Sequence, residues 1–308
     1  MVGRRSLPLE QPLERVTDTP GNVLWRVRER SFELDRPIVL GIVNVTPDSF
    51  SDGGNIFSAG AAVTQGQALI AEGADVLDIG GESTRPGAEP VSVEEEIRRV
   101  VPVVWALRGA FPQVPISVDT VKAPVARAVL DAGASIINDV SGFRLDPEMA
   151  GVCARAKAGV VLMHSRGSVS EMATYVHAKY RDVTAEVSAE LRERVDAALA
   201  AGIDAEAIVV DPGIGFAKRT EHSLQLLADL PRIAALGYPV LVGVSRKRFI
   251  GEITGVPNAD ERDAGTIGAN VAALVRGAAL FRVHDVRGTR QALDVAWSVV
   301  RRVSPTGD

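Results

Sequence analysis

Short apolar runs and longer amphipathic stretches alternate along most of this chain. The apolar runs are rich in Val and Ile and lie at 38–43, 75–79, 115–118, 135–137, 159–163, 207–210, 239–242 and 278–283. Continuous apolar runs of this length are typical of parallel strands that are buried on both faces. Stretches of helical length and period lie between and after them, at 59–71, 93–108, 124–131, 146–157, 182–200, 221–234, 262–276 and 287–300.

Eight strands and eight helices in strict alternation over roughly 265 residues predict a single-domain (β/α)8 TIM barrel. A doubly wound open sheet is the alternative, because periodicity alone does not close a barrel. No Pro-rich or Ser-rich linker interrupts the alternation. We therefore expect one barrel domain over 25–300, a flexible leader at 1–24 as a short N-terminal extension, and a tail at 301–308. Residues 25–34 are expected to form a hairpin that caps the barrel bottom.

A polar or charged residue follows nearly every apolar run. These residues are Asn44, Asp78 with Glu82, Asp119, Asn138, His164, Asp211, Ser245, and Arg282 with His284. In barrel enzymes the catalytic groups lie where the strands end. One such residue has a simpler explanation, because Asp and Asn often cap the next helix. A whole series of polar and charged residues at successive strand ends, with related side-chain chemistry, predicts a site at the carboxyl ends of the strands.

The strand-end residues fall into two chemical groups. Asp119, Asn138 and Asp211 fit the edge of a flat heterocycle rich in N–H groups, and burying them without partners would cost about 1–3 kcal/mol each. The cationic group comprises Arg85, Arg246, Lys247, Arg248, Arg282 and His284. In an acidic chain such a group predicts a phosphate or carboxylate site. The alternative for Arg246 and Arg248 is that they begin a solvated helix.

Composition removes several classes of partner. The 308 residues carry 34 basic and 39 acidic side chains, for a net charge of −5, and 46% are hydrophobic. An acidic surface does not favour DNA or anionic lipid. No apolar run reaches the ~18 residues of a membrane-spanning helix. We therefore expect a cytoplasmic protein with no nucleic-acid or membrane partner, in which the one cysteine, Cys153, is a packing residue.

Nucleotide and zinc signatures are absent from the sequence. The Gly-rich turns at 51–54 and 211–216 let a backbone approach a ligand closely, but neither fits a P-loop or a dinucleotide fingerprint. None of the four histidines lies at ligand spacing from another His or from the cysteine. A magnesium ion held by one protein oxygen, substrate phosphates and water would leave hardly any trace in a sequence.

Six blocks of the sequence resemble, in order, the signature motifs of the dihydropteroate synthases. They read LGIVNVTPDSFSDGG at 40–54, DIGGESTRPG at 78–87, IINDVSG at 136–142, DPGIGF at 211–216, GVSRKRF at 243–249 and RVHDV at 282–286. The resemblance spans 36–298, essentially the whole barrel. Any one block is a weak signal, whereas the ordered combination is specific, and the chain is identified as a member of this family.

The resemblance implies the activity of the family in folate biosynthesis. These transferases condense (7,8-dihydropterin-6-yl)methyl diphosphate with 4-aminobenzoate, which gives 7,8-dihydropteroate and diphosphate. The positions that match the pterin site are Asp119, Asn138, Met163, Asp211, Phe216, Gly243 and Lys247. Asn44, Arg282 and His284 match the diphosphate site, with Mg²⁺ between Asn44 and the phosphates. Ser245 and Arg248 match the side that receives the aminobenzoate carboxylate, and Phe50, Asp52, Thr84, Arg85 and Pro86 match the loops over the reacting centre.

The resemblance also implies a dissociative, SN1-like mechanism. An aniline nitrogen is a weak nucleophile, so diphosphate departs first, assisted by Mg²⁺, Arg282 and His284. Asp119 would stabilise the cation on the methylene carbon, and closed loops would exclude water. Sulfonamides, which mimic aminobenzoate, are expected to be competitive inhibitors. A homodimer is expected on the same basis.

The sequence departs from the family pattern at two places, and two other functions stay open. Arg248 stands where several members have Ser, and 163–171 varies a stretch that often begins Met-His-Met. A pterin-dependent methyltransferase domain shares the barrel, but would not need the Ser-Thr-Arg-Pro loop, Lys247 in its motif or the Arg-Val-His pair. A non-catalytic pterin-binding paralogue would be expected to have lost diphosphate or loop residues, and none is missing.

Overall fold

Eight parallel strands form one curved sheet around the centre of the molecule. The computed structural model describes residues 24–45, 59–83 and 90–301. The strands are β3 (Ile38–Asn44), β4 (Val76–Gly80), β5 (Ile116–Asp119), β6 (Ile136–Asp139), β7 (Gly159–Met163), β8 (Ile208–Asp211), β9 (Leu241–Val242) and β10 (Leu280–Val283). Their order in the sheet is β8-β7-β6-β5-β4-β3-β10-β9. A parallel bridge between Val210 and Val240 joins the two ends of this sheet. The predicted barrel is confirmed, and the doubly wound sheet is wrong.

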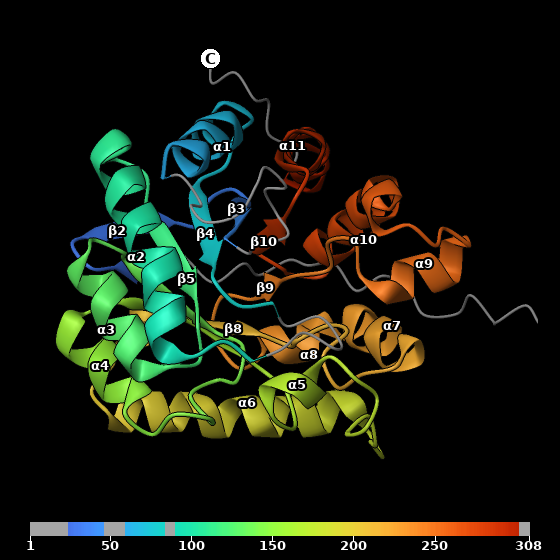
Figure 1. Cartoon of the computed structure of the whole chain (residues 1–308). Helices are drawn as coiled ribbons and strands as arrows, with labels where there is room; N and C mark the ends of the chain where they lie inside the picture. The colour runs from blue at the N-terminus through green and yellow to red at the C-terminus, as the bar shows by residue number, and fades with distance from the viewer. Residues whose placement is uncertain (1–23, 46–58, 84–89, 302–308) are drawn as a thin grey trace, which may run out of the picture.

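Helices surround the strands on every side (Figure 1). They are α1 (Ala59–Ala71), α2 (Val93–Ala110), α3 (Ala123–Asp131), α4 (Met149–Ala156), α5 (Val169–Met172), α6 (Val183–Ala200), α7 (Thr220–Ala228), α8 (Leu230–Ala234), α9 (Arg248–Thr254), α10 (Asp263–Leu274) and α11 (Val286–Arg301). Short 3-10 turns lie at Ala205–Ala207 (η2) and Ala259–Glu261 (η3). The helix expected at 221–234 is divided into α7 and α8, because Pro231 lacks the N–H that an uninterrupted helix needs. The short helix α5 was not predicted, whereas α9 begins at Arg248, where the sequence had indicated the start of a helix.

Local signals explain where several helices begin and end. The Ser92 hydroxyl accepts a hydrogen bond from the amide of Glu95, 3.2 Å away, at the start of α2. Asp182 does the same for the amide of Ala185 at the start of α6, at 3.0 Å. Gly133 follows α3 with a φ of 111°, a conformation that costs glycine little. These caps satisfy backbone groups at helix ends that would otherwise lack partners.

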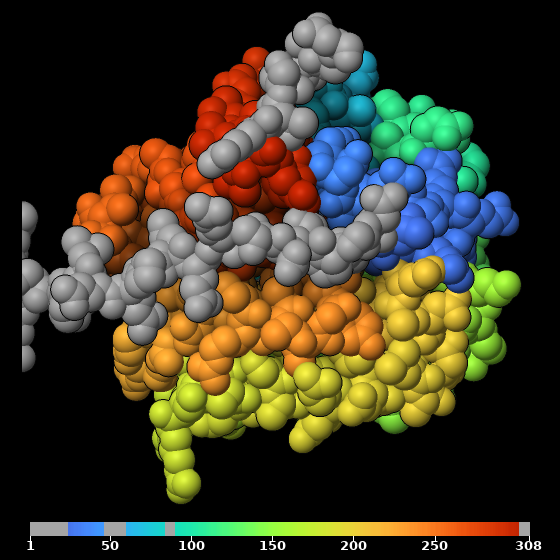
Figure 2. All heavy atoms as spheres, turned by 180° about the vertical axis from the view of Figure 1, so that it is seen from behind, coloured from blue at the N-terminus to red at the C-terminus, as the bar shows by residue number. Residues whose placement is uncertain are grey.

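An antiparallel hairpin closes the lower end of the barrel, as predicted. It consists of β1 (Leu24–Val27) and β2 (Arg30–Glu33). The Trp25 side chain is fully buried against a cluster that includes Leu40, Val76 and Ile136 from three barrel strands. Its indole N–H donates to the carbonyl of Ala207, 3.2 Å away. Figure 2 shows the blue hairpin at the rear surface, beside the yellow residues that follow α6.

The expected leader and tail lie almost wholly outside the described residues. Leu24 belongs to β1 and Arg301 to α11, so one residue of each expected segment is part of a described element. Within the described ranges, no helix combines the length and hydropathy needed to cross a membrane.

Candidate active site

The register of the sheet places polar residues side by side at the carboxyl ends of the strands. Asn44 on β3 pairs with Gly80 on β4, which pairs with Asp119 on β5, which pairs with Asn138 on β6. Asp211 on β8 pairs in the same way with Met163 on β7. Each of these residues is the last or next-to-last of its strand, so the strands are long enough to carry them in fixed positions.

Arg282 links two carboxylates above the barrel core. Its Nε donates to Asp78 Oδ2 at 2.6 Å, and its Nη2 donates to Asp119 Oδ2 at 3.2 Å. The Asp78 side chain is fully buried, and its other oxygen has no hydrogen-bond partner among the described residues. Burial raises the pKa of Asp119 to about 7, with Arg282 opposing this and Asp78 adding to it. The cluster thus contains a carboxyl group that titrates near neutral pH.

A tight turn after β8 shapes the surroundings of Asp211. The amide of Gly213 donates to Asp211 Oδ1 at 2.7 Å. Gly213 has a φ of 65°, and a Cβ there would lie 1.9 Å from the carbonyl oxygen of His164, so only glycine fits. Gly243 lies on the other side, where an added Cβ would be 3.8 Å from Asp211 Oδ2. Burial raises the pKa of Asp211, while the positive charge of Lys247 opposes that rise.

Lys247 reaches from the end of the β9 connection to the turn after β8. Its ammonium group donates to the carbonyl of Ile214 and lies 4.3 Å from the centroid of the Phe216 ring. Burial lowers the pKa of Lys247 to about 8, and the neighbouring carboxylate of Asp211 limits the drop. Lys247, Phe216 and Asp211 therefore form one contiguous wall.

An apolar patch adjoins the charged groups. Met163 and Phe216 belong to one cluster with Val121, Val140 and Met172, separate from the main core. Met163 is buried, whereas Phe216 remains partly exposed. The structure brings together an apolar wall and a row of acidic and amide groups, a combination suited to a flat polar ring.

Ser245 has a different neighbour from the one expected. Its hydroxyl lies 2.9 Å from His284 Nδ1 and accepts from the His284 amide at 3.2 Å. The tautomer of His284 decides whether the hydroxyl or Nδ1 is the donor in this hydrogen bond. Ser245 therefore orients His284, although the resemblance placed it on the aminobenzoate side.

The two arginines that flank Lys247 point elsewhere. Arg246 binds Asp263 and Asp260, each at 2.7 Å, so it does not join the expected anion site. Arg248 is exposed at the start of α9, and its guanidinium carbon lies 4.1 Å from the centroid of the Tyr175 ring. Arg219 approaches the same ring at 5.0 Å. Arg248 is thus stacked on an aromatic surface at the rim of the barrel.

The expected loop residues lie outside the described residues. They are Phe50, Asp52, Thr84, Arg85 and Pro86.

The donor set at the end of β3 suits a metal that is shared with a substrate. Asn44 is half-buried there and offers one amide oxygen. Among residues 24–45, 59–83 and 90–301, no group of three or more His, Cys, Asp and Glu side chains is placed to hold a metal ion. Magnesium takes one or two protein oxygens plus phosphates and water. The residues therefore fit Mg²⁺ that enters with a diphosphate and do not form an independent metal centre.

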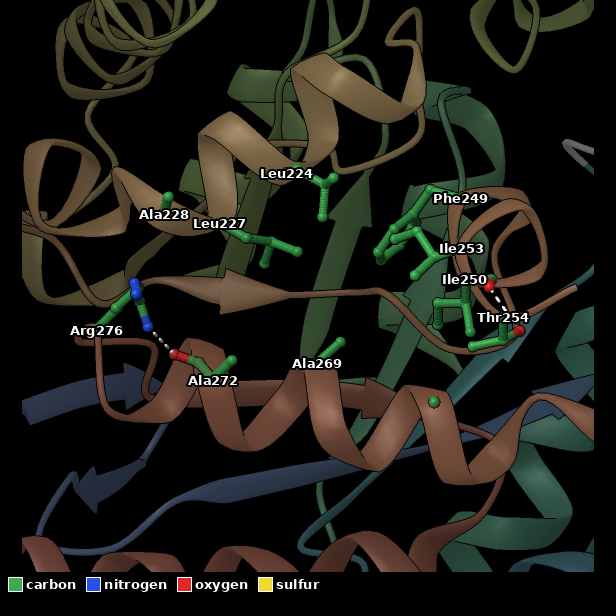
Figure 3. Close-up of a pocket in the computed structure, with 11 residues that line it drawn as sticks. Leu224, Leu227, Ala228, Phe249, Ile250, Ile253, Thr254, Ala269, Ala272 and Arg276 are labelled. Atoms are coloured by element: carbon green, nitrogen blue, oxygen red, sulfur yellow. Dashed lines mark hydrogen bonds between the residues drawn. The ribbon is translucent and has the colours of Figure 1, made fainter. Parts of the chain in front are cut away.

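A second hollow lies in the helical layer, away from the strand ends. It is a groove of about 330 Å³ between α7, α9 and α10. Leu224 and Leu227 from α7 and Phe249 and Ile253 from α9 project toward α10 across this groove (Figure 3). Its lining is largely aliphatic, so it offers no chemistry for a reaction and resembles a packing surface.

Comparison with known proteins places this geometry in a family. The pterin binding enzyme family matches residues 40–284, which include nearly the whole barrel. The chain belongs to this family. The dihydropteroate synthase of Mycobacterium leprae is 48% identical over 266 residues, which cover 84% of this chain and 93% of that enzyme. The chain is thus a transferase of the dihydropteroate synthase type.

Solved structures of family members share the fold. The Xanthomonas albilineans dihydropteroate synthase with 4-aminobenzoic acid has a TM-score of 0.84 and 50% identity, and the match covers 92% of this chain and 100% of that one. The same enzyme with 7,8-dihydropteroate has a TM-score of 0.80 and 48% identity, with coverage of 91% and 100%. The Yersinia pestis enzyme in a sulfonamide complex has a TM-score of 0.84 and 39% identity, with coverage of 91% and 100%.

Proposed function

We propose that this protein is an active dihydropteroate synthase that condenses (7,8-dihydropterin-6-yl)methyl diphosphate with 4-aminobenzoate. The observation that carries the proposal is the joint presence of Asp119, Asn138 and Asp211 beside the cation Arg282 at one end of the barrel. The family members solved with 4-aminobenzoic acid and with 7,8-dihydropteroate support it.

The pterin ring would bind between the polar row and the apolar patch. Asp211 and Asn138 accept from or donate to the amino and oxo edge of the ring, and Lys247 adds a donor on the same side. Met163 and Phe216 supply the apolar walls. Gly243 would lie beside the ring, because its Cα borders both Asp211 and Arg282.

The diphosphate would lie near Asn44, Arg282 and His284. His284 is oriented by the hydrogen bond between its Nδ1 and the Ser245 hydroxyl. Asn44 would hold Mg²⁺, which supplies charge neutralisation for the phosphate oxygens when bound. Arg282 stabilises the negative charge that develops on the leaving group, and Asp78 keeps its guanidinium in place.

Bond cleavage precedes bond formation in the mechanism that we propose. The carbon–oxygen bond of the methylene breaks, and its electron pair leaves with diphosphate. Asp119 faces this region and, when ionised, stabilises the positive charge that spreads over the methylene and the pterin ring. The aminobenzoate nitrogen then donates its lone pair to the methylene carbon and loses one proton to solvent. This step requires no strong base at the amine.

The aminobenzoate carboxylate would lie near Arg248 at the rim. Phe50 and Asp52 on one loop, with Thr84, Arg85 and Pro86 on the other, would cover the reacting centre and exclude water. Sulfonamides would compete for the same position, in line with the sulfonamide complex of the Yersinia pestis enzyme.

We also propose that two copies of the chain associate through the helical groove. Leu224 and Ile253 on its lining are 45% and 55% exposed, which is unusual for large aliphatic side chains on adjacent helices. Sedimentation velocity tests this proposal. A dimer that dissociates on Leu224→Glu agrees with it, and a wild-type monomer at micromolar concentration contradicts it.

A coupled assay tests the activity. Purified protein is incubated with the dihydropterin diphosphate, 4-aminobenzoate and Mg²⁺, while dihydropteroate is followed by mass spectrometry and diphosphate release is followed in parallel. Equal production of both, lost when Mg²⁺ or aminobenzoate is omitted, is the expected result. Pterin binding without product would instead indicate a non-catalytic paralogue, and methyl transfer to a corrinoid would indicate the methyltransferase class.

A further inference from the structure

Lys218 is a fully buried ammonium group that the proposed reaction does not use. It ends the segment that begins with Asp211, and only 1% of the residue is exposed. Its Nζ lies 2.9 Å from His164 Nδ1, 3.0 Å from the Gly213 carbonyl and 2.9 Å from the Phe216 carbonyl. The His164 carbonyl lies 3.4 Å away as a fourth acceptor. A protonated lysine has three N–H groups to donate to this set, whereas a neutral amine has two.

The charge of Lys218 is balanced through a neutral histidine. His164 Nε2 lies 3.0 Å from Glu190 Oε2, so the imidazole donates to that carboxylate while its Nδ1 accepts from Lys218. Burial and, next, the charge of Lys218 together lower the pKa of His164 to about 4, so the ring stays neutral. Burial acts to raise the pKa of Glu190, but hydrogen bonds from His164 and Arg166 lower it to about 2. The network therefore joins an ammonium to a carboxylate across one ring.

Both carbonyls that Lys218 holds belong to residues that shape the pterin site. The carbonyl of Gly213 accepts from Lys218, while the amide of the same residue donates to Asp211. The carbonyl of Phe216 accepts from Lys218, while its ring lies under Lys247. Between them Lys247 binds the carbonyl of Ile214 from the site side. Two lysines thus hold carbonyl groups of one turn.

The turn needs such support because its backbone is unusual. Gly213, Gly215 and Ala217 all have left-handed φ values, of 65°, 82° and 48°. Ala217 is fully buried in a conformation that is unfavourable for any residue with a Cβ. The carbonyl groups of Gly213 and Phe216 both accept from Lys218, and that of Gly213 also accepts from the amide of Phe216 at 3.0 Å.

We propose that Lys218 is a positioning residue for pterin binding, which holds the Asp211 turn in shape and keeps the Asp211 carboxylate charged from behind the site. This inference rests on the proposed pterin site. It differs from a purely structural role, because it predicts an effect on the ionisation of a ligand-binding group as well as on folding.

The electrostatic part follows from the charges around each group. Asp211 is faced by Lys247, Lys218 and Arg282, and all three oppose the rise in its pKa that burial causes. The negative charges of Asp211 and Glu190 raise the pKa of Lys218, and the positive charges of Lys247 and Arg166 lower it. Burial lowers the pKa of Lys218 well below its ordinary value, and Asp211 is the first charge that opposes this. Loss of the Lys218 charge therefore raises the pKa of Asp211.

The test compares variants of the full-length protein by calorimetric titration with the dihydropterin diphosphate across pH. For Lys218→Met we expect binding to weaken by about tenfold or more, as for a lost hydrogen bond to a charged group. We also expect the acid limb of binding to move up by about one pH unit. Lys218→Arg, which keeps the charge, is expected to return the acid limb toward its original position. Leu226→Ala, on the buried face of α7, is the control that lowers stability without moving the limb.

If Lys218→Met does not fold, Glu190→Gln provides a second test of the inference. Glu190 is 35% exposed, so this change is tolerated, and it removes the carboxylate that balances Lys218. Weaker pterin binding above neutral pH, where Lys218 would lose its proton more readily, is the expected result. An unchanged affinity and acid limb in Lys218→Met, or an unchanged affinity in Glu190→Gln, would overturn the inference. Wild-type protein that does not bind the pterin would instead overturn the proposed function.

Discussion

The two ends of the barrel are built from the same strands, but the lower end stabilises the fold, whereas the upper end holds the candidate active site. At the lower end β3 and β4 contribute Leu40 and Val76 to a cluster sealed by Trp25, with no charged member. A few residues further along the same strands lie Asn44 and Asp78, and Asp78 is a fully buried carboxylate. The lower end gains stability by removing apolar surface from water. The upper end holds buried charges at a cost, which a ligand can relieve.

The largest effect is expected at the lower end, from Trp25→Ala. Loss of a fully buried indole should reduce the free energy of unfolding by about 3–5 kcal/mol. Pterin affinity of the molecules that remain folded should be unchanged, because Trp25 lies at the opposite end from the site. Chemical denaturation and calorimetric titration check the two halves of this prediction. A large loss of pterin affinity at low temperature would show that the two ends are coupled.

Asp211→Ala should produce the reverse pattern at the upper end. We expect pterin binding to weaken by about 100-fold, because a charged acceptor for the ring is lost. The free energy of unfolding should change far less than in Trp25→Ala, since burial already disfavours this carboxylate. Titration with the dihydropterin diphosphate measures the first quantity, and wild-type affinity would remove Asp211 from the site.

Asp78→Asn should change the pH dependence of the reaction. Asp78 adds negative charge near Asp119, whose pKa of about 7 is raised mainly by burial. Removing that charge lowers the pKa of Asp119, so the acid limb of kcat/KM should move to lower pH by about one unit or less. A pH–rate profile decides this. Movement to higher pH would mean that release of Arg282, rather than the charge of Asp78, dominates.

The smallest effect is expected at the rim, from Arg248→Ser. Arg248 is exposed and stacked on Tyr175, so its loss should raise the KM for 4-aminobenzoate by about fivefold or less. Arg219→Ser is the matched control, because Arg219 approaches the same ring from α7. Equal changes in both variants would assign the effect to Tyr175 packing, and a larger change in Arg248→Ser would assign it to carboxylate recognition.

The barrel could be predicted because its main strands and helices each have a local sequence signal. The apolar runs mark the strands to within about two residues, and the polar residue that follows a run such as 207–210 proved to be the last residue of the strand. The division between α7 and α8 was missed although Pro231 lies inside the expected helix. The proline was visible in the sequence, but the helical period of residues 221–234 continues across it, so a single helix was predicted.

The contacts that organise the site could not be predicted in the same way. Arg282 and Asp78 are 204 positions apart, and nothing local to either residue indicates the other. The pairing of Ser245 with His284 depends on the closeness of β9 and β10 in the closed barrel. Lys218 lies two residues beyond the Gly-rich motif and was not singled out from the sequence, because its burial beside His164 depends on the folded barrel. Pairwise geometry of this kind arises from closure of the sheet.

The seam between β8 and β9 has a consequence for how the molecule opens. In the described part of the chain these two strands share one bridge, between Val210 and Val240, and β9 itself has two residues. Few backbone hydrogen bonds therefore connect the strand that ends at Asp211 to the segment that carries Ser245 and Lys247. Amide hydrogens along such a seam exchange with solvent through low-energy local opening. A ligand that contacts both strands would hold them together. It would therefore slow amide hydrogen exchange at this seam more than between β4 and β5.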